Sequence, residues 1–262
     1  MSLSGCPVKI IRPPRSQKML DHVTAAAKRK GMVVNGRKTK LMCVSAAASY
    51  GAKAELLDDT GEIIQSVDSI KVLGVHLDSD AKFTSHVAAI ARKMRSKTWT
   101  LRDLKKTGLT EDQLIKVYIS LIRPSAEYAC AFWHSQITAE QAALIEAQQT
   151  RALRNIYGAG LSAARMRKKA GLTTLSQRRD ELCLGFARKC VKSPRFSNWF
   201  QRKPYRAANE RLNKDVKIFY ENRAKTDKHF NSPISYMKRL LSRGYQSCCC
   251  DIFITFSFFE RF

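Results

Sequence analysis

The spacing of apolar residues divides the chain into a part with short β-prone runs and a longer part with helical periodicity. Apolar residues recur at helical spacing from Gln17 to Gly31, where the glycine is placed as a helix C-cap. The short apolar runs within residues 40–80 are typical of strands. From residue 84 to 193 the spacing is helical almost throughout. This pattern predicts an α+β fold, with a small antiparallel β portion followed by a mostly α-helical bundle.

Composition refines this pattern into five segments. Prolines interrupt the first residues, and Lys and Arg are dense after residue 194. The last stretch, "CCCDIFITFSFFERF", is apolar with no polar alternation, and read-through past a coding end would account for it. The predicted segments are 1–16, an irregular lead-in; 17–80, a helix with β hairpins; 81–193, a helical region; 194–242, a basic segment that is helical or loosely ordered; and 243–262, an apolar tail that is unstructured or read-through.

Turn and cap signals mark where several of these elements begin and end. Asn-Gly at 35–36 predicts a tight turn between two apolar stretches. Asp-Asp-Thr-Gly at 58–61 predicts a hairpin turn, because Asp can bond the backbone ahead of it and Gly allows a positive φ. The Thr-x-x-Gln spacing at 110–113 and 138–141 predicts two capping boxes, and Pro124 predicts a kink or break in the helix that contains it.

The excess of basic over acidic residues indicates which class of molecule the protein is expected to bind. Lys and Arg number 47 against 22 acidic residues, which gives a formal net charge of +25. Folding does not require that excess, and it strengthens attraction to polyanions. RNA or DNA is therefore the expected partner, with an anionic membrane surface second and an ordinary Lys-rich surface as the alternative without a ligand. The chain has no apolar run of about 18 residues, so we predict no membrane span.

The cysteines and large aromatics favour packing over chemistry. The eight cysteines contain no C-x-x-C pair, which argues against a structural zinc site or a disulfide framework and favours a reducing intracellular compartment, the nucleus before the cytoplasm. Cys183 and Cys190 are seven residues apart and are expected to be buried. Trp99, Phe132 and Trp133 are expected in the core more than as base-stacking platforms.

The order of several segments resembles the C-terminal part of a non-LTR (LINE-like) retrotransposon reverse transcriptase. "GMVVNGRKTKLM" matches the palm element called motif D, and "VLGV" in "IKVLGVHLD" matches the primer-grip strand called motif E. Segments similar to those of the family's helical thumb follow in the same order, so the resemblance covers roughly 17–242. It implies that 17–80 is the end of a palm and that 81–193 is a thumb-like region. The motif D matches are Gly31, Met32, Asn35, Lys38 and Thr39, and the motif E matches are Leu73, Gly74 and Val75.

The same resemblance implies that the chain lacks the family's catalytic centre. The family's aspartates lie in an aromatic-x-Asp-Asp turn before motif D, whereas Asp58 and Asp59 follow the match and have Leu56 in place of the aromatic. The expectation is a truncated, inactive fragment with no cofactor, although an intact parent enzyme would need Mg²⁺. Two alternatives stay open: an active enzyme whose fingers and palm are missing from this gene model or are supplied by another polymerase fragment, and a retained basic RNA- or DNA-binding module.

Nucleic-acid contacts are expected at residues of both parts. Lys38 holds the motif D lysine position, where the family's lysine helps to protonate the leaving pyrophosphate, and here it is expected to be idle. Gly74 would let a primer backbone approach, or is a bulge or packing glycine. Cations on the polar side of the first thumb-like helix would track phosphates without reading sequence. The predicted nucleic-acid-binding residues are Lys38, Lys71, Gly74, Lys93, Arg95, Lys97, Arg102, Lys105 and Lys106.

Overall fold

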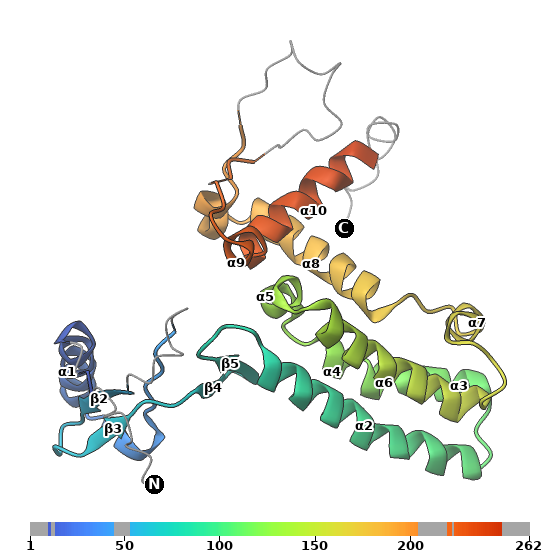
Figure 1. Cartoon of the computed structure of the whole chain (residues 1–262), viewed down its shortest axis with the longest axis horizontal. Coiled ribbons are helices and arrows are strands. Elements are labelled where there is room, and N and C mark those ends of the chain that lie inside the picture. Colours follow the sequence, from blue (N-terminus) through green and yellow to red (C-terminus); the bar gives the residue numbers. More distant parts are fainter. Residues whose placement is uncertain (1–9, 12–13, 45–52, 204–218, 222, 248–262) are drawn as a thin grey trace, which may run out of the picture. The chain divides into compact units, whose positions relative to one another are not determined.

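The computed structural model describes residues 10–11, 14–44, 53–203, 219–221 and 223–247. The chain divides into two compact units, unit 1 (Met1–His86) and unit 2 (Val87–Phe262) (Figure 1). The described strands all belong to unit 1, and the described part of unit 2 is built from helices apart from one isolated β-bridge. The fold is therefore α+β, with small sheets followed by a helical part, as the hydrophobic pattern predicts.

Unit 1 combines one helix with two small sheets. In the three-stranded sheet, β2 (Lys53–Leu57) lies between β1 (Ile10–Ile11), its parallel partner, and β3 (Ile63–Gln65), its antiparallel partner. The second sheet is the antiparallel hairpin of β4 (Ser69–Val72) and β5 (Val75–Asp78). Four of these strands lie within the predicted range of residues 40–80, and β1 lies outside it.

The predicted irregular lead-in, residues 1–16, is wrong in its described part. Ile10–Ile11 form β1, and helix α1 (Pro14–Arg29) begins three residues before the predicted Gln17. Proline fits the first turn of a helix, because the N–H it lacks has no acceptor there. Gln17 then fastens α1 to β2: its Nε2 donates to the carbonyl of Leu57 at 2.8 Å, and its Oε1 accepts from the Leu57 N–H at 2.9 Å.

The Asn-Gly pair at 35–36 makes a helix cap, so the predicted tight turn between strands is wrong. Asn35 has φ −83°, and its Oδ1 accepts a hydrogen bond from the N–H of Lys38 at 3.1 Å. This caps the 3₁₀ helix η1 (Gly36–Lys38). A short polar side chain serves a cap as well as a turn, and the local dipeptide does not decide between the two.

The Asp-Asp-Thr-Gly turn is confirmed. Residues 58–61 connect β2 to β3, and Gly61 has φ +81°. Asp58 Oδ1 accepts hydrogen bonds from the N–H of Thr60 at 2.9 Å and the N–H of Glu62 at 2.8 Å. Gly36 lies against the same carboxylate, since a Cβ atom built at Gly36 would overlap Asp58 Oδ2. The turn is thus braced both by its own backbone and by the segment that precedes the sheet.

A two-residue turn replaces part of the predicted primer-grip strand. Val72 pairs with Val75, so Leu73 and Gly74 form the loop between β4 and β5. Their φ values of +47° and +87° are those of a type I′ hairpin turn. Gly74 is therefore a turn glycine, neither the bulge nor the packing glycine considered from the sequence. Leu73 is 87% exposed at a φ that branched side chains rarely adopt.

Helices fill residues 84–193, all of which the structure describes, and no strand lies among them, as predicted. Helix α2 begins in unit 1 and continues through unit 2, where the other helices follow (Figure 1). The elements are α2 (Thr84–Lys106), α3 (Glu111–Val117), the π-helix η3 (Tyr118–Ile122), α4 (Pro124–Glu127), α5 (Cys130–Trp133), η4 (His134–Gln136), α6 (Ala139–Tyr157), α7 (Ala163–Lys169), α8 (Leu175–Lys192), η5 (Pro194–Trp199), α9 (Asp227–Phe230) and α10 (Pro233–Ser247).

Capping boxes start three of these helices. Those at 110–113 and 138–141, before α3 and α6, are confirmed, and a third at 174–177 starts α8. In each, the Thr hydroxyl accepts a hydrogen bond from the N–H three residues on, and the Gln side-chain oxygen accepts one from the Thr backbone N–H. Because the donors and acceptors are within four residues, this signal can be read from sequence alone.

The regular α-helix is interrupted next to Pro124, where the sequence predicts a kink or break. The chain widens ahead of it into the π-helix η3, in which the N–H of Arg123 donates to the carbonyl of Tyr118 five residues back at 2.9 Å. The wider turn accommodates the proline ring and its missing N–H. The break follows at Ala129, whose φ is +51°, and the chain then resumes as α5.

The predicted segments 194–242 and 243–262 are both corrected by α10. This helix crosses the predicted boundary at 242/243, and residues 248–262 lie outside the described part. The basic segment is predicted to be helical or loosely ordered, and its described residues include the helices η5, α9 and most of α10, which pack into a core against α8. The segment has few apolar residues, but several of those that the structure describes pack against one another. The buried members of this core are Ala187, Cys190, Phe200, Phe219, Met237 and Leu241.

The main core of unit 2 confirms some expected burials and corrects others. Trp133 is fully buried, and so are Cys183 and Cys190, as expected. Trp99 and Phe132 are 63% and 49% exposed, so their assignment to the core is wrong. In the described part of the chain, no helix combines the length and the apolar character that a membrane crossing demands.

Candidate nucleic-acid interface

One face of α2 carries alternating cationic and aromatic side chains. Arg95, Trp99 and Arg102 follow one another at spacings of four and three residues, so they project from the same side of the helix. Residues of the buried stripe, Met94 and Leu101 among them, point the other way into the core. The amphipathic pattern of α2 thus orients this set toward solvent.

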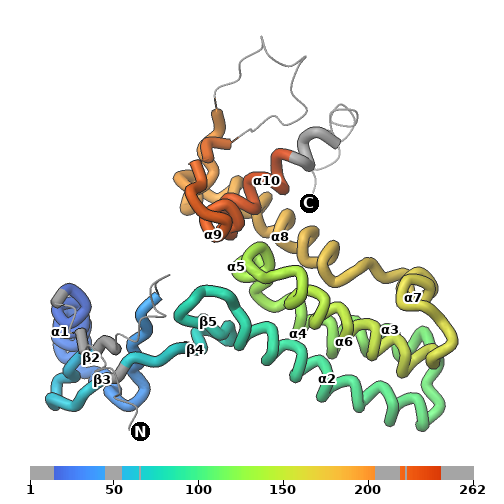
Figure 2. Tube along the Cα trace, in the orientation of Figure 1, coloured from blue at the N-terminus to red at the C-terminus, as the bar shows by residue number. Residues whose placement is uncertain are grey.

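Helix α6 completes the site from the opposite side. Figure 2 traces α2 and α6 past one another, and hydrogen bonds join them along this stretch. Arg151 and Asn155, four residues apart on α6, face the set on α2. Together they enclose a cationic pocket of about 210 Å³, lined by Arg95, Thr98, Trp99, Arg102, Arg151 and Asn155.

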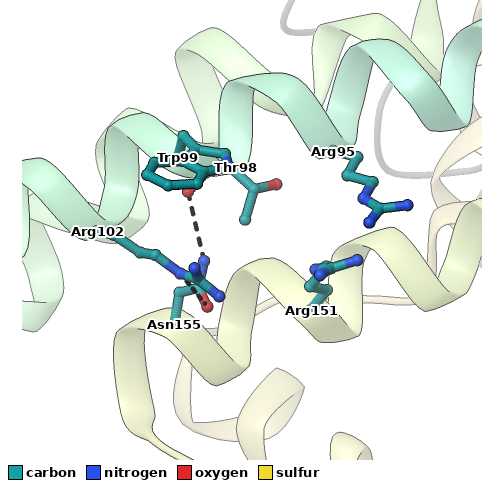
Figure 3. A pocket seen from close by; sticks show the side chains of 6 residues that line it. All are labelled: Arg95, Thr98, Trp99, Arg102, Arg151 and Asn155. Carbon is teal, nitrogen blue, oxygen red and sulfur yellow. Dashed lines mark hydrogen bonds between the residues drawn. The ribbon is translucent and has the colours of Figure 1, made fainter.

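Arg95 and Arg151, two of the pocket's three arginines, have no partner among the residues that the structure describes. Figure 3 shows the guanidinium groups of Arg95 and Arg151 pointing toward one another across the pocket. Neither forms an ion pair or hydrogen bond with any residue that the structure describes, and no carboxylate lines the pocket. Two facing guanidinium groups repel each other, and an anion between them would relieve that repulsion.

The remaining polar groups of the pocket are already engaged within the protein. Arg102 lies over the Trp99 ring at 5.7 Å, and its Nε donates a long hydrogen bond of 3.4 Å to Asn155 Oδ1. Asn155 Nδ2 in turn donates to the carbonyl of Thr98 at 3.4 Å, both drawn in Figure 3. The Thr98 hydroxyl donates to the Met94 carbonyl at 2.7 Å. The neutral side chains Thr98 and Asn155 therefore bond within α2 and between the two helices, and they have few hydrogen-bonding groups left for a ligand.

Besides Arg102, two of the six cations predicted on α2 are used by the fold. Lys97 Nζ donates to the carbonyl of Leu121 at 2.7 Å and to Ser125 Oγ at 3.2 Å, and burial lowers the pKa of Lys97 with help from the charge of Lys93. Lys105 Nζ donates to the carbonyl of Ile156 at 2.7 Å, at the C-terminal end of α6. A cation there complements the free carbonyls and the helix dipole.

The other predicted residues are placed as follows. Lys93 and Lys106 are exposed on α2, and they do not line the cationic pocket. Lys38 is exposed in η1, and Lys71 is exposed on β4 opposite His76. Lys38, Lys71 and Gly74 belong to unit 1, and the pocket belongs to unit 2. The structure thus brings together Arg95 and Arg102 of the predicted set.

Sequence reasoning missed Arg151 and misjudged Trp99. Arg151 stands on α6, and its convergence with Arg95 depends on how two helices pack, which residue spacing along one helix does not reveal. Trp99 stands directly after Thr98 in the apolar stripe of α2, so a periodicity count absorbs it into the core. The sequence did contain a signal for this site: Trp99 lies one position away from the apolar stripe, with arginines four residues before it and three residues after it.

The aspartate pair is committed to its turn. Hydrogen bonds, first that from the Thr60 hydroxyl and then those from the backbone, hold the pKa of Asp58 below its ordinary value. Asp59 forms an ion pair with Lys28 of α1 at 3.2 Å. Among the described residues, no group of three or more His, Cys, Asp or Glu side chains is placed to hold a metal ion.

A buried polar chain in unit 2 looks catalytic but is built for packing. Arg179, fully buried, donates from Nε to His134 Nδ1 at 3.0 Å, and His134 Nε2 lies 2.8 Å from Asp180 Oδ1. Tyr236 of α10 donates to the same carboxylate oxygen at 2.5 Å. Since Nδ1 already accepts from a permanent cation and Nε2 faces a carboxylate, neither nitrogen is available as a general base. The chain ties α8, η4 and α10 together.

No protein-family model, curated protein or solved structure matches this chain. The resemblance to LINE-like reverse transcriptases thus stays a prediction from sequence. The cationic pocket is accordingly interpreted from its own chemistry: two guanidinium groups with no partner in the described part of the chain, an exposed tryptophan and an absence of acidic side chains among its lining residues.

Proposed function

We propose that this chain binds RNA or DNA without regard to sequence, and that it is a non-catalytic remnant of a LINE-like reverse transcriptase. The observation that carries the binding proposal is the facing pair Arg95 and Arg151, which have no partner among the described residues. A phosphodiester is the anion that a net charge of +25 also favours over long range. The proposed origin rests on the ordered sequence resemblance across 17–242.

Independence of sequence follows from which groups in the pocket are free. Bases are discriminated by hydrogen bonds from side chains to their edges, most often by Asn, Gln or Arg in bidentate geometry. Asn155 and Thr98 are engaged with carbonyl oxygens of α2. The two arginines that remain, Arg95 and Arg151, face each other and are assigned to a phosphate, a contact that carries no sequence information.

The experiment is a fluorescence titration of the full chain with labelled oligonucleotides across a range of salt. The logarithm of the binding constant should fall linearly with the logarithm of salt, by about 0.9 per duplex phosphate contacted. With about five contacts, raising salt from about 50 to 200 mM weakens binding several-hundred-fold. Oligonucleotides of unrelated sequence should bind alike.

Matched double variants locate the site. Arg95→Gln with Arg151→Gln should lower the slope by about one to two and weaken all sequences equally. Arg188→Gln with Lys189→Gln removes the same charge from an exposed part of α8 and should change binding little. Tight binding that persists at high salt, or strong discrimination between unrelated sequences, would contradict the proposal.

A further inference from the structure

Trp99 is the feature of the pocket that phosphate binding leaves unexplained. Trp99 is 63% exposed, whereas Met94 and Leu101 of the same helix are fully buried. Arg102 lies over the ring at 5.7 Å, within the range of a cation–π contact, which keeps the indole at the edge of the pocket. A large aromatic held outward among arginines, and not turned into the core, presents a flat apolar surface to a ligand.

The size of the pocket limits what it encloses. Its volume of about 210 Å³ is below the roughly 300 Å³ at which pockets for drug-sized ligands begin. It can take a phosphodiester group between Arg95 and Arg151, and a base attached to that phosphate has to lie outside. Trp99 lines the same pocket and is the aromatic residue among its lining residues, so its indole is the flat surface that the pocket offers to such a base.

We infer that the cationic pocket selects single-stranded nucleic acid, with a phosphate held by Arg95 and Arg151 and an unpaired base stacked on Trp99. This inference rests on the proposed function and adds its substrate class. In a duplex both faces of each internal base are covered by neighbouring base pairs, so only an unpaired or terminal base has a face to offer. Stacking of this kind tolerates any base, because every base has a π-face. It therefore adds affinity without sequence preference.

The test uses the full chain carrying Trp199→Phe, which removes the other exposed tryptophan. Buried Trp133 is then the only tryptophan besides Trp99. Three probes are compared at low salt: a 12-nucleotide oligothymidylate, the same backbone with abasic sites, and a 12-base-pair duplex. The single strand should quench Trp99 emission, and the abasic strand should bind through its phosphates without that quenching.

Substitution of the indole separates stacking from charge. Trp99→Leu should weaken the single strand about 5- to 150-fold, the equivalent of one stacked base, and leave the abasic strand and the duplex within twofold. Trp99→Phe should restore part of the loss. Phe132→Leu, at an exposed aromatic outside the pocket, should change none of the three. Circular dichroism would check that each variant keeps its helices.

The outcomes distinguish this inference from the function on which it rests. If no probe binds at low salt, the proposed nucleic-acid function fails. If all three probes bind and lose affinity in the Arg95→Gln, Arg151→Gln variant, but Trp99→Leu affects them equally or not at all, the function stands and the stacking inference is wrong. A duplex that binds more tightly than the single strand would also overturn the inference.

Discussion

Lys97 of α2 donates a hydrogen bond of 2.7 Å from its Nζ to the carbonyl oxygen of Leu121, three residues before Pro124. The bond falls in the π-helix that accommodates the proline, where the regular backbone ladder is interrupted. Ser125, just beyond the proline, provides a second acceptor at 3.2 Å. A lysine expected to track phosphates is therefore part of the contact between α2 and the irregular helix beside it.

Because of this contact, Lys97 should contribute more to stability than Lys93, which lies one turn earlier on α2. Lys97→Met keeps the aliphatic stem but removes a charged hydrogen bond, so the free energy of unfolding should fall by about 1 kcal/mol at this half-buried position. Lys93→Met, at an exposed position one turn earlier, should lower it by less than about 0.5 kcal/mol. Urea denaturation measures both. Equal losses would show that the bond to Leu121 adds nothing.

Ala129 offers a test of the break between α4 and α5. Its φ of +51° costs an alanine about 1–2 kcal/mol, and glycine avoids this at about 0.5–1 kcal/mol of extra unfolded-state entropy. Ala129→Gly should therefore raise the free energy of unfolding by about 0.5–1 kcal/mol. The control is Ala131→Gly, two residues on within α5, which should lower it by a similar amount. Destabilisation by both changes would count against a strained Ala129.

Features with determinants inside four or five residues could be predicted from the sequence. The capping boxes at 110–113 and 138–141 and the turn at 58–61 each contain their own donors and acceptors. The same holds for the α+β division, because strand and helix periods are local properties. The prediction for Asn35-Gly36 was wrong because this dipeptide suits both a helix cap and a hairpin turn. Asn35 caps η1 here, and the dipeptide alone does not reveal which of the two forms.

Features that depend on packing between distant segments could not be predicted from the sequence. Phe200 and Phe219 meet edge to face with ring centres 5.9 Å apart, although each stands in a basic stretch with no helical or alternating pattern. The cationic pocket is of the same kind, since Arg95 and Arg151 belong to different helices. Net charge predicted the class of partner, but only tertiary structure distinguishes the arginines that are free from the lysines, such as Lys105, that are engaged.

His86 should make the stability of unit 1 depend on pH in a defined window. Burial, and then the charge of His76, lowers the pKa of His86 from 6.5 to about 4. The fold favours the neutral ring, so its contribution is complete above about pH 6.5 and declines as pH falls toward about 4. Asp78 and Asp180, whose pKa values are lowered from 3.8, lose their contributions only below that window.

Urea denaturation of the full chain at pH 7.5 and pH 5 measures this effect. The free energy of unfolding should be smaller at pH 5 than at pH 7.5 by on the order of 1 kcal/mol. His86→Gln should reduce that difference, because an amide oxygen can still accept from the N–H of His76 but does not titrate. His22→Gln, at an exposed position of α1, should leave it unchanged. A pH dependence that survives His86→Gln would place its source elsewhere.

Gly36 tests whether the braced turn at 58–61 holds unit 1 together. A Cβ atom at position 36 overlaps the Asp58 carboxylate, which bonds the turn backbone at Thr60 and Glu62. Gly36→Ala should therefore displace the carboxylate and destabilise the unit, and Asp58→Ala, which removes the bonds themselves, should do so too. Gly160→Ala is the control, since a Cβ atom there meets open space. Hydrogen exchange at the N–H groups of residues 60 and 62 reports the turn directly.

The catalytic prediction follows from the same commitment of the aspartates. Two-metal phosphoryl transfer needs carboxylates that converge to hold two ions about 4 Å apart. Asp58 turns back onto its own loop, and Asp59 pairs with Lys28 at 3.2 Å. Purified chain with primer–template, Mg²⁺ and nucleotides should therefore give no extension above background, and Asp59→Asn, which removes the ion pair with Lys28, should affect stability alone. If the unsubstituted chain extends the primer and Asp59→Ala abolishes that extension, the assignment of residues 58–61 as a turn without catalytic role is wrong and the protein is a polymerase.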